Sequence, residues 1–327
     1  MPFSSVTFCG RWDLQGIPRV CAPAAEFSFA FEGASLALEL EGEARFRIEI
    51  DGKDFSILET RERKIYPVAA DLENGIHEAR VRKMTETEFG SISLWKIYPE
   101  PIPQKTKTFP LKMEFIGDSY TVGFGNSAPN PITGTAFSTT DATRSYAALV
   151  AEKFHADFQV NAYSGRGLVQ NYMQIAPRWT IPQLYLYTLG GESPLGNSPS
   201  WDFSAFHPDI LCLFIGINDW QGEGSHPNPA IFDAAYSDFL DFIRSKHQLS
   251  HIFLLSTDIF PQNFLPERIE SVFSRELSRG NRDISHIYLP TPQNSGLDFH
   301  PNLSRHEAMA NKLFQKINTH IEQKKCI

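Results

Sequence analysis

The feature that most constrains this sequence is a change in its hydrophobic period part-way along the chain. Between Val6 and Tyr98, apolar and polar residues alternate with the period of two that is typical of half-buried β-strands. After Tyr98 the pattern changes to short apolar runs separated by stretches with a helical period. These patterns bury apolar residues in different ways, and a chain of 327 residues is long enough for two hydrophobic cores. We therefore predict two domains.

The alternating part predicts an N-terminal domain made of β-strands. Its turns are marked by the pairs Glu32-Gly33, Glu41-Gly42 and Asp51-Gly52. The clearest strand segments are residues 26–31, 35–40, 45–50, 76–81 and 92–97. About eight short strands at this spacing are typical of an all-β sandwich of the jelly-roll kind. We assign residues 1–104 to this domain.

A proline-rich linker and an alternation of strands with helices follow. Pro99, Pro101 and Pro103 precede a polar stretch, so we place the domain boundary between residues 104 and 105. Strands are expected at residues 113–116, 158–162, 210–215, 252–256 and 286–289, and helices at 145–155, 231–246, 267–277 and 304–323. This alternation predicts an α/β domain of three layers over residues 105–327, with a mainly parallel five-stranded sheet.

Charge and hydropathy exclude two classes of partner. The chain has 30 Lys and Arg residues against 38 Asp and Glu, and its net charge of −8 without a basic run argues against nucleic acid. No stretch approaches the roughly 18 apolar residues of a membrane-spanning helix, so no membrane partner is expected. Residues 1–12 lack the pattern of a signal peptide, which favours a cytoplasmic protein. A secreted or periplasmic location is the alternative if a leader precedes Met1, and the oligomeric state is not predicted.

The four cysteines do not have the paired spacing of a metal or redox site. They are Cys9, Cys21, Cys212 and Cys326, and we predict no metal from them. Cys212 lies in an apolar run and is expected to be a buried thiol. A disulfide between Cys9 and Cys21 is the alternative to two free thiols.

Two polar clusters follow the first two predicted strands of the α/β domain. In parallel sheets the carboxyl ends of the strands lie at one edge, where functional groups collect. Ser119 stands at the start of a Gly-rich turn, where it acts either as a nucleophile or as a helix cap. Gly165 follows the second strand, and a glycine there lets a backbone N–H approach a ligand closely, unless this is an ordinary turn.

Two further clusters follow later strands. The Asn218 side chain can donate a hydrogen bond to an oxyanion, although an Asn-Asp turn explains it equally well. His300 precedes the last helix and can accept a proton near neutral pH, whereas a lone loop histidine is more often surface. Together with Ser119 and Gly165, these residues supply a nucleophile, two oxyanion donors and a base in chain order. This combination indicates serine hydrolase chemistry.

The order of these blocks resembles the SGNH (GDSL-type) hydrolase superfamily, whose name letters correspond to Ser119, Gly165, Asn218 and His300. A jelly roll followed by such a domain is similar to carbohydrate esterase family 2, the acetyl esterases that act on plant polysaccharides. Matching motifs are Lys83-Met84-Thr85-Glu86 with Gly90, Arg144-Ser145-Tyr146-Ala147, Ser164-Gly165-Arg166-Gly167, Trp201-Asp202-Phe203 and Pro208-Asp209. The resemblance covers nearly the whole chain.

The resemblance implies a serine esterase that removes O-acetyl groups from carbohydrates such as acetylxylan or acetylglucomannan, without a cofactor. Ser119 would attack the acetyl carbonyl, and His300 would take the serine proton. The N–H groups of Ser119 and Gly165 and the Asn218 amide would hold the oxyanion. The superfamily usually has an Asp three residues before the histidine, where this chain has Leu297. Asp298 is therefore expected to orient His300, and backbone carbonyls are the alternative that some relatives use.

Residues beside these blocks are candidates for substrate contacts. Phe299 and Trp220 are predicted to pack against a sugar ring, and Arg166 to contact substrate, with a structural role as the alternative for each. Asp118 and Asp219 are expected to have structural roles. Residues 177–201 are expected to form a long loop at the border of the cleft.

Two other functions stay open. One is a lysophospholipase or thioesterase on the same fold, because a fold does not determine the substrate. The other is a carbohydrate-binding protein without catalytic activity, in which the jelly roll binds the glycan.

Overall fold

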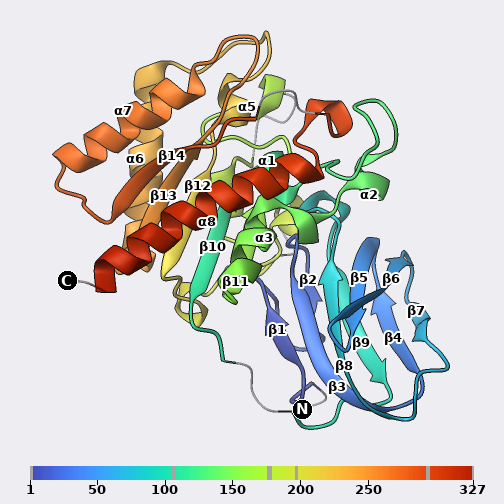
Figure 1. Ribbon diagram of the computed structural model, residues 1–327. Coiled ribbons are helices and arrows are strands. Elements are labelled where there is room, and N and C mark those ends of the chain that lie inside the picture. Colours follow the sequence, from blue (N-terminus) through green and yellow to red (C-terminus); the bar gives the residue numbers. More distant parts are fainter. Residues whose placement is uncertain (1–2, 105–107, 175–178, 196–197, 292–294, 326–327) are drawn as a thin grey trace.

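The computed structural model describes residues 3–104, 108–174, 179–195, 198–291 and 295–325, and it contains an N-terminal β-domain beside a larger α/β domain (Figure 1). Each domain has its own cluster of buried apolar side chains. The predicted boundary between residues 104 and 105 adjoins residues 105–107, which lie outside the described residues. The exact boundary therefore stays a prediction.

The N-terminal domain consists of two antiparallel sheets. One sheet has the order β1 (Thr7–Cys9), β3 (Glu26–Gly33), β8 (Gly75–Lys83), β5 (Ala44–Ile50) and β6 (Lys53–Thr60). The other has the order β2 (Arg19–Val20), β9 (Ile92–Tyr98), β4 (Leu36–Glu41) and β7 (Lys64–Ala69). These nine strands in the described residues confirm the predicted jelly-roll sandwich, for which the sequence indicated about eight.

The alternation seen in the sequence corresponds to the two faces of each strand. In β4, Leu36, Leu38 and Leu40 are buried, while the residues between them are partly exposed. In β3, the rings of Phe27 and Phe29 stack in the core with centroids 6.1 Å apart. Many of the 26 Phe residues of the chain therefore fill the core.

The second domain has the predicted five-stranded parallel sheet. Its order is β11 (Asp157–Ala162), β10 (Lys112–Gly117), β12 (Ile210–Phe214), β13 (His251–Ser256) and β14 (Ile284–Tyr288). Every residue of β12 and β13 is buried, because helices cover both faces of the sheet (Figure 1). This burial explains why these strands appear in the sequence as continuous apolar runs.

The four predicted helices are present, each within two residues of its expected bounds. They are α3 (Tyr146–Lys153), α6 (Pro229–Lys246), α7 (Leu265–Ser278) and α8 (Leu303–Lys325). Helices α3 and α8 pack together on one face of the sheet, and α6 and α7 pack on the other (Figure 1). Shorter helical turns are η1 (Thr87–Phe89), α1 (Ser119–Val122), α2 (Ala136–Thr139), η2 (Ala142–Arg144), η3 (Tyr172–Gln174), α4 (Ile181–Leu184), η4 (Gly190–Leu195), η5 (Phe203–Ala205), α5 (Ile217–Trp220) and η6 (Leu297–Phe299). Over the described ranges, none of the helices combines the length and the apolar character that crossing a membrane requires.

The described cysteines are free thiols. Cys9, Cys21 and Cys212 are buried and unpaired, whereas Cys326 lies outside the described residues. Burial raises the pKa of all three thiols. The structure therefore contains no disulfide between Cys9 and Cys21.

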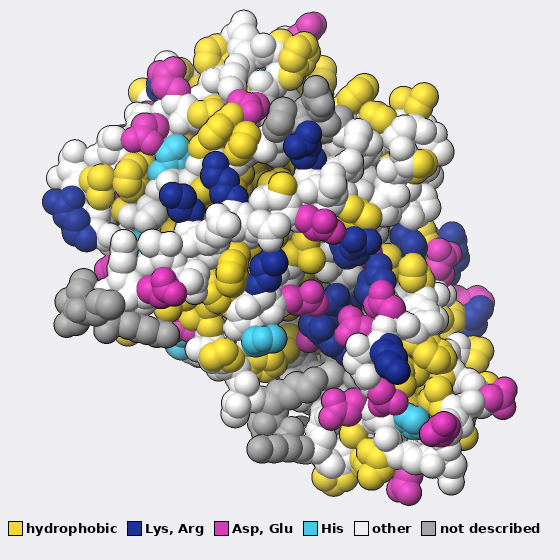
Figure 2. Space-filling view, viewed as in Figure 1, with side chains coloured by type: hydrophobic (Ala, Val, Ile, Leu, Met, Phe, Trp, Pro, Cys, Tyr) yellow, Lys and Arg dark blue, Asp and Glu magenta, His cyan; other side chains and the backbone are white. Residues whose placement is uncertain are grey.

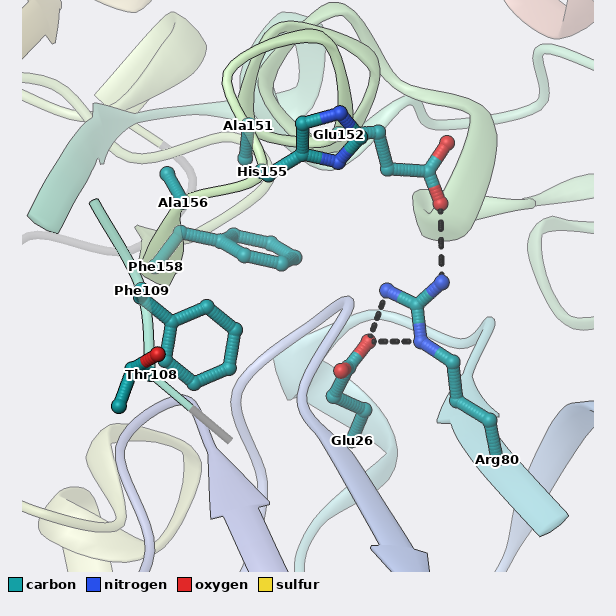
Figure 3. Close-up of a pocket in the computed structure, with 9 residues that line it drawn as sticks. All are labelled: Glu26, Arg80, Thr108, Phe109, Ala151, Glu152, His155, Ala156 and Phe158. Atoms are coloured by element: carbon teal, nitrogen blue, oxygen red, sulfur yellow. Dashed lines mark hydrogen bonds and ion pairs between the residues drawn. The ribbon is translucent and has the colours of Figure 1, made fainter. Parts of the chain in front are cut away.

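Charged residues connect the two domains. Basic and acidic side chains gather where the two lobes meet (Figure 2). Arg80 of β8 lies between Glu26 of β3, at 2.9 Å, and Glu152 of α3, at 3.3 Å. These side chains border a cavity of about 450 Å³ that Phe109 and Phe158 also line (Figure 3). Ion pairs thus join the β-domain to α3 of the α/β domain.

Arg11 makes the most deeply buried ion pair among the described residues, and it connects the two domains. Its guanidinium lies 3.1 Å from the Glu114 carboxylate of β10 and donates to the Tyr185 carbonyl at 2.7 Å. Glu114 also accepts from the Asn161 amide at 2.6 Å and from the Tyr185 hydroxyl at 3.0 Å. The ring of Trp201 packs on the guanidinium at 4.6 Å. Because these hydrogen bonds satisfy both charges, the pair tolerates complete burial.

This arrangement predicts that Arg11→Met lowers the free energy of unfolding by about 3–5 kcal/mol, because Glu114 would be left as an unpaired buried charge. Urea unfolding measures the loss. The matched control is Arg19→Met, which removes a partly exposed arginine paired with Asp13 and should cost at most about 1 kcal/mol. Equal losses in the two variants would contradict the importance of the buried pair.

Candidate active site

The nucleophile candidate stands directly after the first strand of the parallel sheet. Strand β10 ends at Gly117, and the Asp118 carboxylate then caps α1 by accepting the Tyr120 N–H at 3.0 Å. This hydrogen bond is the structural role expected for Asp118. Ser119 is the first residue of α1, so its position is set by the strand on one side and the capped turn on the other.

His300 lies within hydrogen-bond distance of this serine. Its Nε2 is 2.9 Å from the Ser119 Oγ, and its Nδ1 is 3.0 Å from the Leu297 carbonyl oxygen. Because a carbonyl can only accept, Nδ1 carries the proton and Nε2 is left to accept the Ser119 hydroxyl. The rings of Phe124 and Tyr120 enclose the imidazole, with centroids 4.6 Å and 5.4 Å away. Burial lowers the pKa of His300, which keeps the imidazole neutral and able to accept a proton.

The structure corrects the role expected for Asp298. Its side chain is exposed and makes no hydrogen bond to His300 in the described part of the chain. The backbone explains why, since both Asp298 and Phe299 adopt positive φ, +48° and +58°, and this reversal brings the Leu297 carbonyl to the imidazole. The Leu297 carbonyl, and not the Asp298 carboxylate, therefore makes the direct contact with the imidazole. The Asp298 charge acts at longer range and partly offsets the lowering of the pKa of His300.

Two residues of this site, Ser119 and Gly165, bring their backbone N–H groups to the pocket. Among the described residues, the N–H groups of Ser119 and Gly165 have no hydrogen-bond partner. Gly165 has a φ of +73°, a conformation that favours glycine. The N–H of Tyr163 donates to the Gly117 carbonyl at 3.0 Å, which joins the ends of β11 and β10. The structure thus brings Gly165 to the same pocket as Ser119.

Asn218 also lines this pocket, and its amide is held in place. The Nδ2 group donates to the Arg166 carbonyl at 2.9 Å and to Asp118 Oδ2 at 3.2 Å. Burial and the nearby Asp219 raise the pKa of Asp118 to about 8. Asp219 accepts the N–H groups of Leu168, Val169 and Gln170 at 2.8, 2.8 and 3.0 Å, which is the expected structural role. Both carboxyls therefore support the loops around Asn218.

The pocket has a volume of about 420 Å³ and a mixed lining. Besides the four block residues, its walls include Tyr120, Phe124, Ser164, Tyr172, Ile217 and Gln221. Phe124 was detectable from the sequence, because it lies in the Gly-rich turn after Ser119. Tyr172 and Gln221 could not be identified from the sequence as pocket residues. They reach the pocket through irregular turns, which have no hydrophobic period.

The three residues predicted to contact substrate lie in different surroundings in the structure. Trp220 is only 3% exposed and packs on Phe232 and Phe264, with centroids 5.4 and 5.7 Å away, so its predicted sugar contact is wrong. Trp220 lies two residues after Asn218 in α5, which puts it about 200° around the helix and away from the pocket. Phe299 is 66% exposed beside His300, and its contact with a sugar stays a prediction.

Arg166 and the long loop also differ from their predicted places. The Arg166 Nε lies 3.6 Å from Glu88 of the β-domain, and Arg166 is not among the residues that line the pocket. Of the described residues between 177 and 201, Tyr185 and Trp201 pack on Arg11, and none lines the pocket. The parts at residues 177–178 and 196–197 lie outside the described residues. Both segments therefore connect the domains.

The fold and the four blocks define an SGNH-type serine hydrolase that carries an N-terminal sandwich. A family model described as GDSL-like Lipase/Acylhydrolase family matches residues 115–312, and one described as Carbohydrate esterase 2 N-terminal matches residues 8–103. Together these matches span both domains. The chain belongs to carbohydrate esterase family 2, within the GDSL-like hydrolases.

Similar proteins cover nearly the whole chain. An acetylxylan esterase / glucomannan deacetylase of Cellvibrio japonicus (strain Ueda107) is 30% identical over 93% of this chain and 85% of its own length. A family two carbohydrate esterase of Clostridium thermocellum, solved in complex with cellohexaose, has a TM-score of 0.89 at 24% identity and covers 97% of this chain and 99% of that one. A Corynascus thermopiles family 2 enzyme with a carbohydrate binding domain has a TM-score of 0.85 at 26% identity, over 97% and 100% of the two chains.

The backbone contact at His300 predicts that Asp298→Asn leaves the imidazole in the same tautomer. Because the Asp298 charge raises the pKa of His300, its removal should lower that pKa further while Nδ1 stays protonated. An NMR titration of the imidazole nitrogens measures both properties. The matched control is Asp71→Asn in the β-domain, another exposed aspartate with positive φ, +61°. Transfer of the proton from Nδ1 to Nε2 in Asp298→Asn would contradict the backbone contact.

Proposed function

We propose that this protein is a serine esterase that removes O-acetyl groups from carbohydrates through an acetyl-serine intermediate. The observation that carries this proposal is the 2.9 Å contact between Ser119 Oγ and His300 Nε2, in a pocket bordered by two N–H groups that have no partner within the described residues. Membership of carbohydrate esterase family 2 supports an acetylated carbohydrate as the substrate. So does the similarity to an acetylxylan esterase / glucomannan deacetylase.

The first half of the reaction transfers the acetyl group to the enzyme. Ser119 Oγ attacks the acetyl carbonyl carbon while its proton moves to Nε2 of His300. The carbonyl electrons move to the oxygen, and the N–H groups of Ser119 and Gly165 stabilise this oxyanion. The Asn218 amide joins them by exchanging its longer hydrogen bond, the one to Asp118 at 3.2 Å, for one to the oxyanion. Each such donor is worth about 3–4 kcal/mol in the transition state. The tetrahedral intermediate then releases the sugar oxygen, which takes the proton from His300.

The second half hydrolyses the acetyl-serine. A water molecule attacks the acetyl carbon, and His300 again takes the proton at Nε2. The intermediate breaks down to acetate and returns the proton to Ser119. The Leu297 carbonyl keeps the imidazole oriented in both halves, and the Asp298 charge favours the imidazolium that forms in each of them. We therefore propose that a catalytic dyad, Ser119 and His300, performs the proton transfers.

Acetate release from acetylated xylan tests this function. Ser119→Ala should lower the rate at least about a thousandfold, because no other group replaces the nucleophile. Ser278→Ala, an exposed serine at the end of α7, is the matched control and should retain full activity. A Ser119→Ala rate within about tenfold of the unmodified protein would overturn the proposal.

In the same assay, Phe299→Ala should raise KM if the exposed ring contacts the sugar.

A series of p-nitrophenyl esters separates the acetyl esterase from a lysophospholipase or thioesterase. We expect kcat/KM to fall steadily from acetate to octanoate. An increase along this series would favour the lipid-type alternative. A protein that binds the acetylated glycan but hydrolyses none of these esters would instead support the non-catalytic binding function.

Asn218→Ala is expected to lower kcat by about a hundredfold with little change in KM, because the amide would contact the oxyanion only in the transition state. Steady-state kinetics with p-nitrophenyl acetate measure both constants. Asn318→Ala, which changes an exposed amide on α8 that donates to Glu322, is the control. An unchanged kcat in Asn218→Ala would mean that this side chain only holds the loops, through its bonds to Asp118 and Arg166.

A further inference from the structure

A segment of the α/β domain, residues 138–143, lies between strand β5 and the turn that contains Gly125. On the side of the β-domain, the Arg47 guanidinium of β5 lies 2.6 Å from the Asp141 carboxylate. On the side of the turn, the Thr140 hydroxyl accepts the Gly125 N–H at 3.0 Å. The 138–143 segment therefore connects a charged side chain of the β-domain to a turn beside the active site.

The ion pair between Arg47 and Asp141 is closely held. Asp141 is 2% exposed, and its Oδ1 accepts the N–H and the hydroxyl of Thr143 at 3.1 and 2.5 Å, while Oδ2 faces the guanidinium. The Arg47 Nε also donates to the Thr143 hydroxyl at 3.1 Å. The other acid beside Arg47 is Asp54, at 3.0 Å, which is exposed. Loss of the guanidinium would therefore leave the buried Asp141 charge without its cation.

The backbone of Asp141 holds the turn of the active site. Its N–H donates to Asn126 Oδ1 and its carbonyl accepts from Asn126 Nδ2, both at 2.9 Å. The Gly125 carbonyl then accepts the Leu297 N–H at 3.1 Å, and the Asn126 carbonyl accepts the Leu303 N–H at 3.0 Å. Residues 125–126 therefore fix both ends of the loop that carries the catalytic imidazole.

We propose that Arg47, a residue of the β-domain, positions the imidazole of His300 through Asp141. Asp141 fixes the turn of residues 125–126, and this turn sets the Leu297 carbonyl that accepts the imidazole Nδ1–H at 3.0 Å. This inference rests on the proposed function, because it treats His300 as the base. Arg47 is a positioning residue and not a catalytic one, since it is not among the residues that line the pocket.

Two further contacts keep the 138–143 segment against the β-domain when the Arg47 guanidinium is removed. They are hydrogen bonds of 2.7 and 2.9 Å, from Arg45 to the Ser138 carbonyl and from the Ala142 N–H to the Met84 carbonyl. We therefore expect the loss of Arg47 to displace Asp141 without detaching the segment. A catalytic group must be held within about 0.5 Å of its productive position, so a small displacement is enough to lower the rate.

The test follows the imidazole and the rate together. In the unmodified protein, the His300 Nδ1 proton should give a downfield ¹H NMR signal, because it is hydrogen-bonded to a carbonyl. In Arg47→Met this signal should move upfield and exchange faster with water. The kcat for p-nitrophenyl acetate should fall about tenfold, with KM within about threefold of the original value. Arg47→Lys keeps a cation for Asp141 and should recover part of both losses.

Arg80→Met is the matched control. Arg80 is another arginine of the β-domain that bridges to the α/β domain, but its ion-pair partners are Glu26, Glu49 and Glu152 (Figure 3). Its kcat should stay within about twofold of the original value, and the imidazole signal should not move.

Asp141→Asn removes the same ion pair from the other side. It should lower kcat as Arg47→Met does, and the double variant should lose no more than the larger single loss. Unfolding temperatures identify any variant that does not fold. If Arg47→Met does not fold, Asp141→Asn carries the test.

Three results would overturn this proposal. They are an unchanged imidazole signal and kcat in Arg47→Met, an equal fall of kcat in Arg80→Met, and effects that multiply in the double variant. Acetate release from acetylated xylo-oligosaccharides is measured separately on the unmodified protein. If it is absent while p-nitrophenyl acetate is cleaved, the carbohydrate function fails and the test of Arg47 stands. A protein inactive on both substrates overturns the proposed function, and the imidazole signal then decides the role of Arg47 by itself.

Discussion

The catalytic pair depends on one close backbone contact, between Gly125 and Leu297. The Leu297 N–H donates to the Gly125 carbonyl at 3.1 Å, and a Cβ on Gly125 would lie 2.2 Å from the Leu297 Cβ. Gly125 also has a positive φ, +57°, so only glycine fits this turn without strain. The contact brings the Leu297 carbonyl to the imidazole and His300 to Ser119, which is 181 residues away in the chain.

The β-domain supports this arrangement from two sides. Arg47 of β5 pairs with Asp141 at 2.6 Å. The backbone of Asp141 exchanges two hydrogen bonds of 2.9 Å with the side chain of Asn126, the residue after Gly125. On the other side, Thr87 Oγ1 donates to the Ala162 carbonyl at 2.8 Å and Glu88 lies 3.6 Å from the Arg166 Nε, so the contacts fall on both sides of Gly165. Because both catalytic loops rest on the sandwich, the two domains are expected to act as one catalytic unit. A sandwich that only bound glycan would not require these contacts.

Much of this architecture could be predicted from the sequence. The parallel strands are continuous apolar runs, and the blocks of Ser119, Gly165, Asn218 and His300 follow strands or precede the last helix, so topology brings them together. The predictions that failed did so because of local backbone and helix geometry. The spacing of Asp298 suggested a triad, but two successive positive φ angles present a carbonyl instead. The predicted sugar contact of Trp220 fails because proximity in the sequence does not show which side of a one-turn helix faces the cleft. The hydrogen bond of Thr87 to the Ala162 carbonyl joins segments 75 residues apart, and no local pattern reveals it.

The proposed mechanism requires that Ser119 forms an acetyl-enzyme with the help of His300. The most direct test mixes the protein rapidly with p-nitrophenyl acetate, quenches the reaction in acid and locates any added acetyl group by mass spectrometry. We expect one acetyl group on Ser119, formed with the burst of p-nitrophenol and absent from Ser119→Ala. A burst without modification of Ser119, or an acetyl group on another residue at the burst stoichiometry, would contradict it.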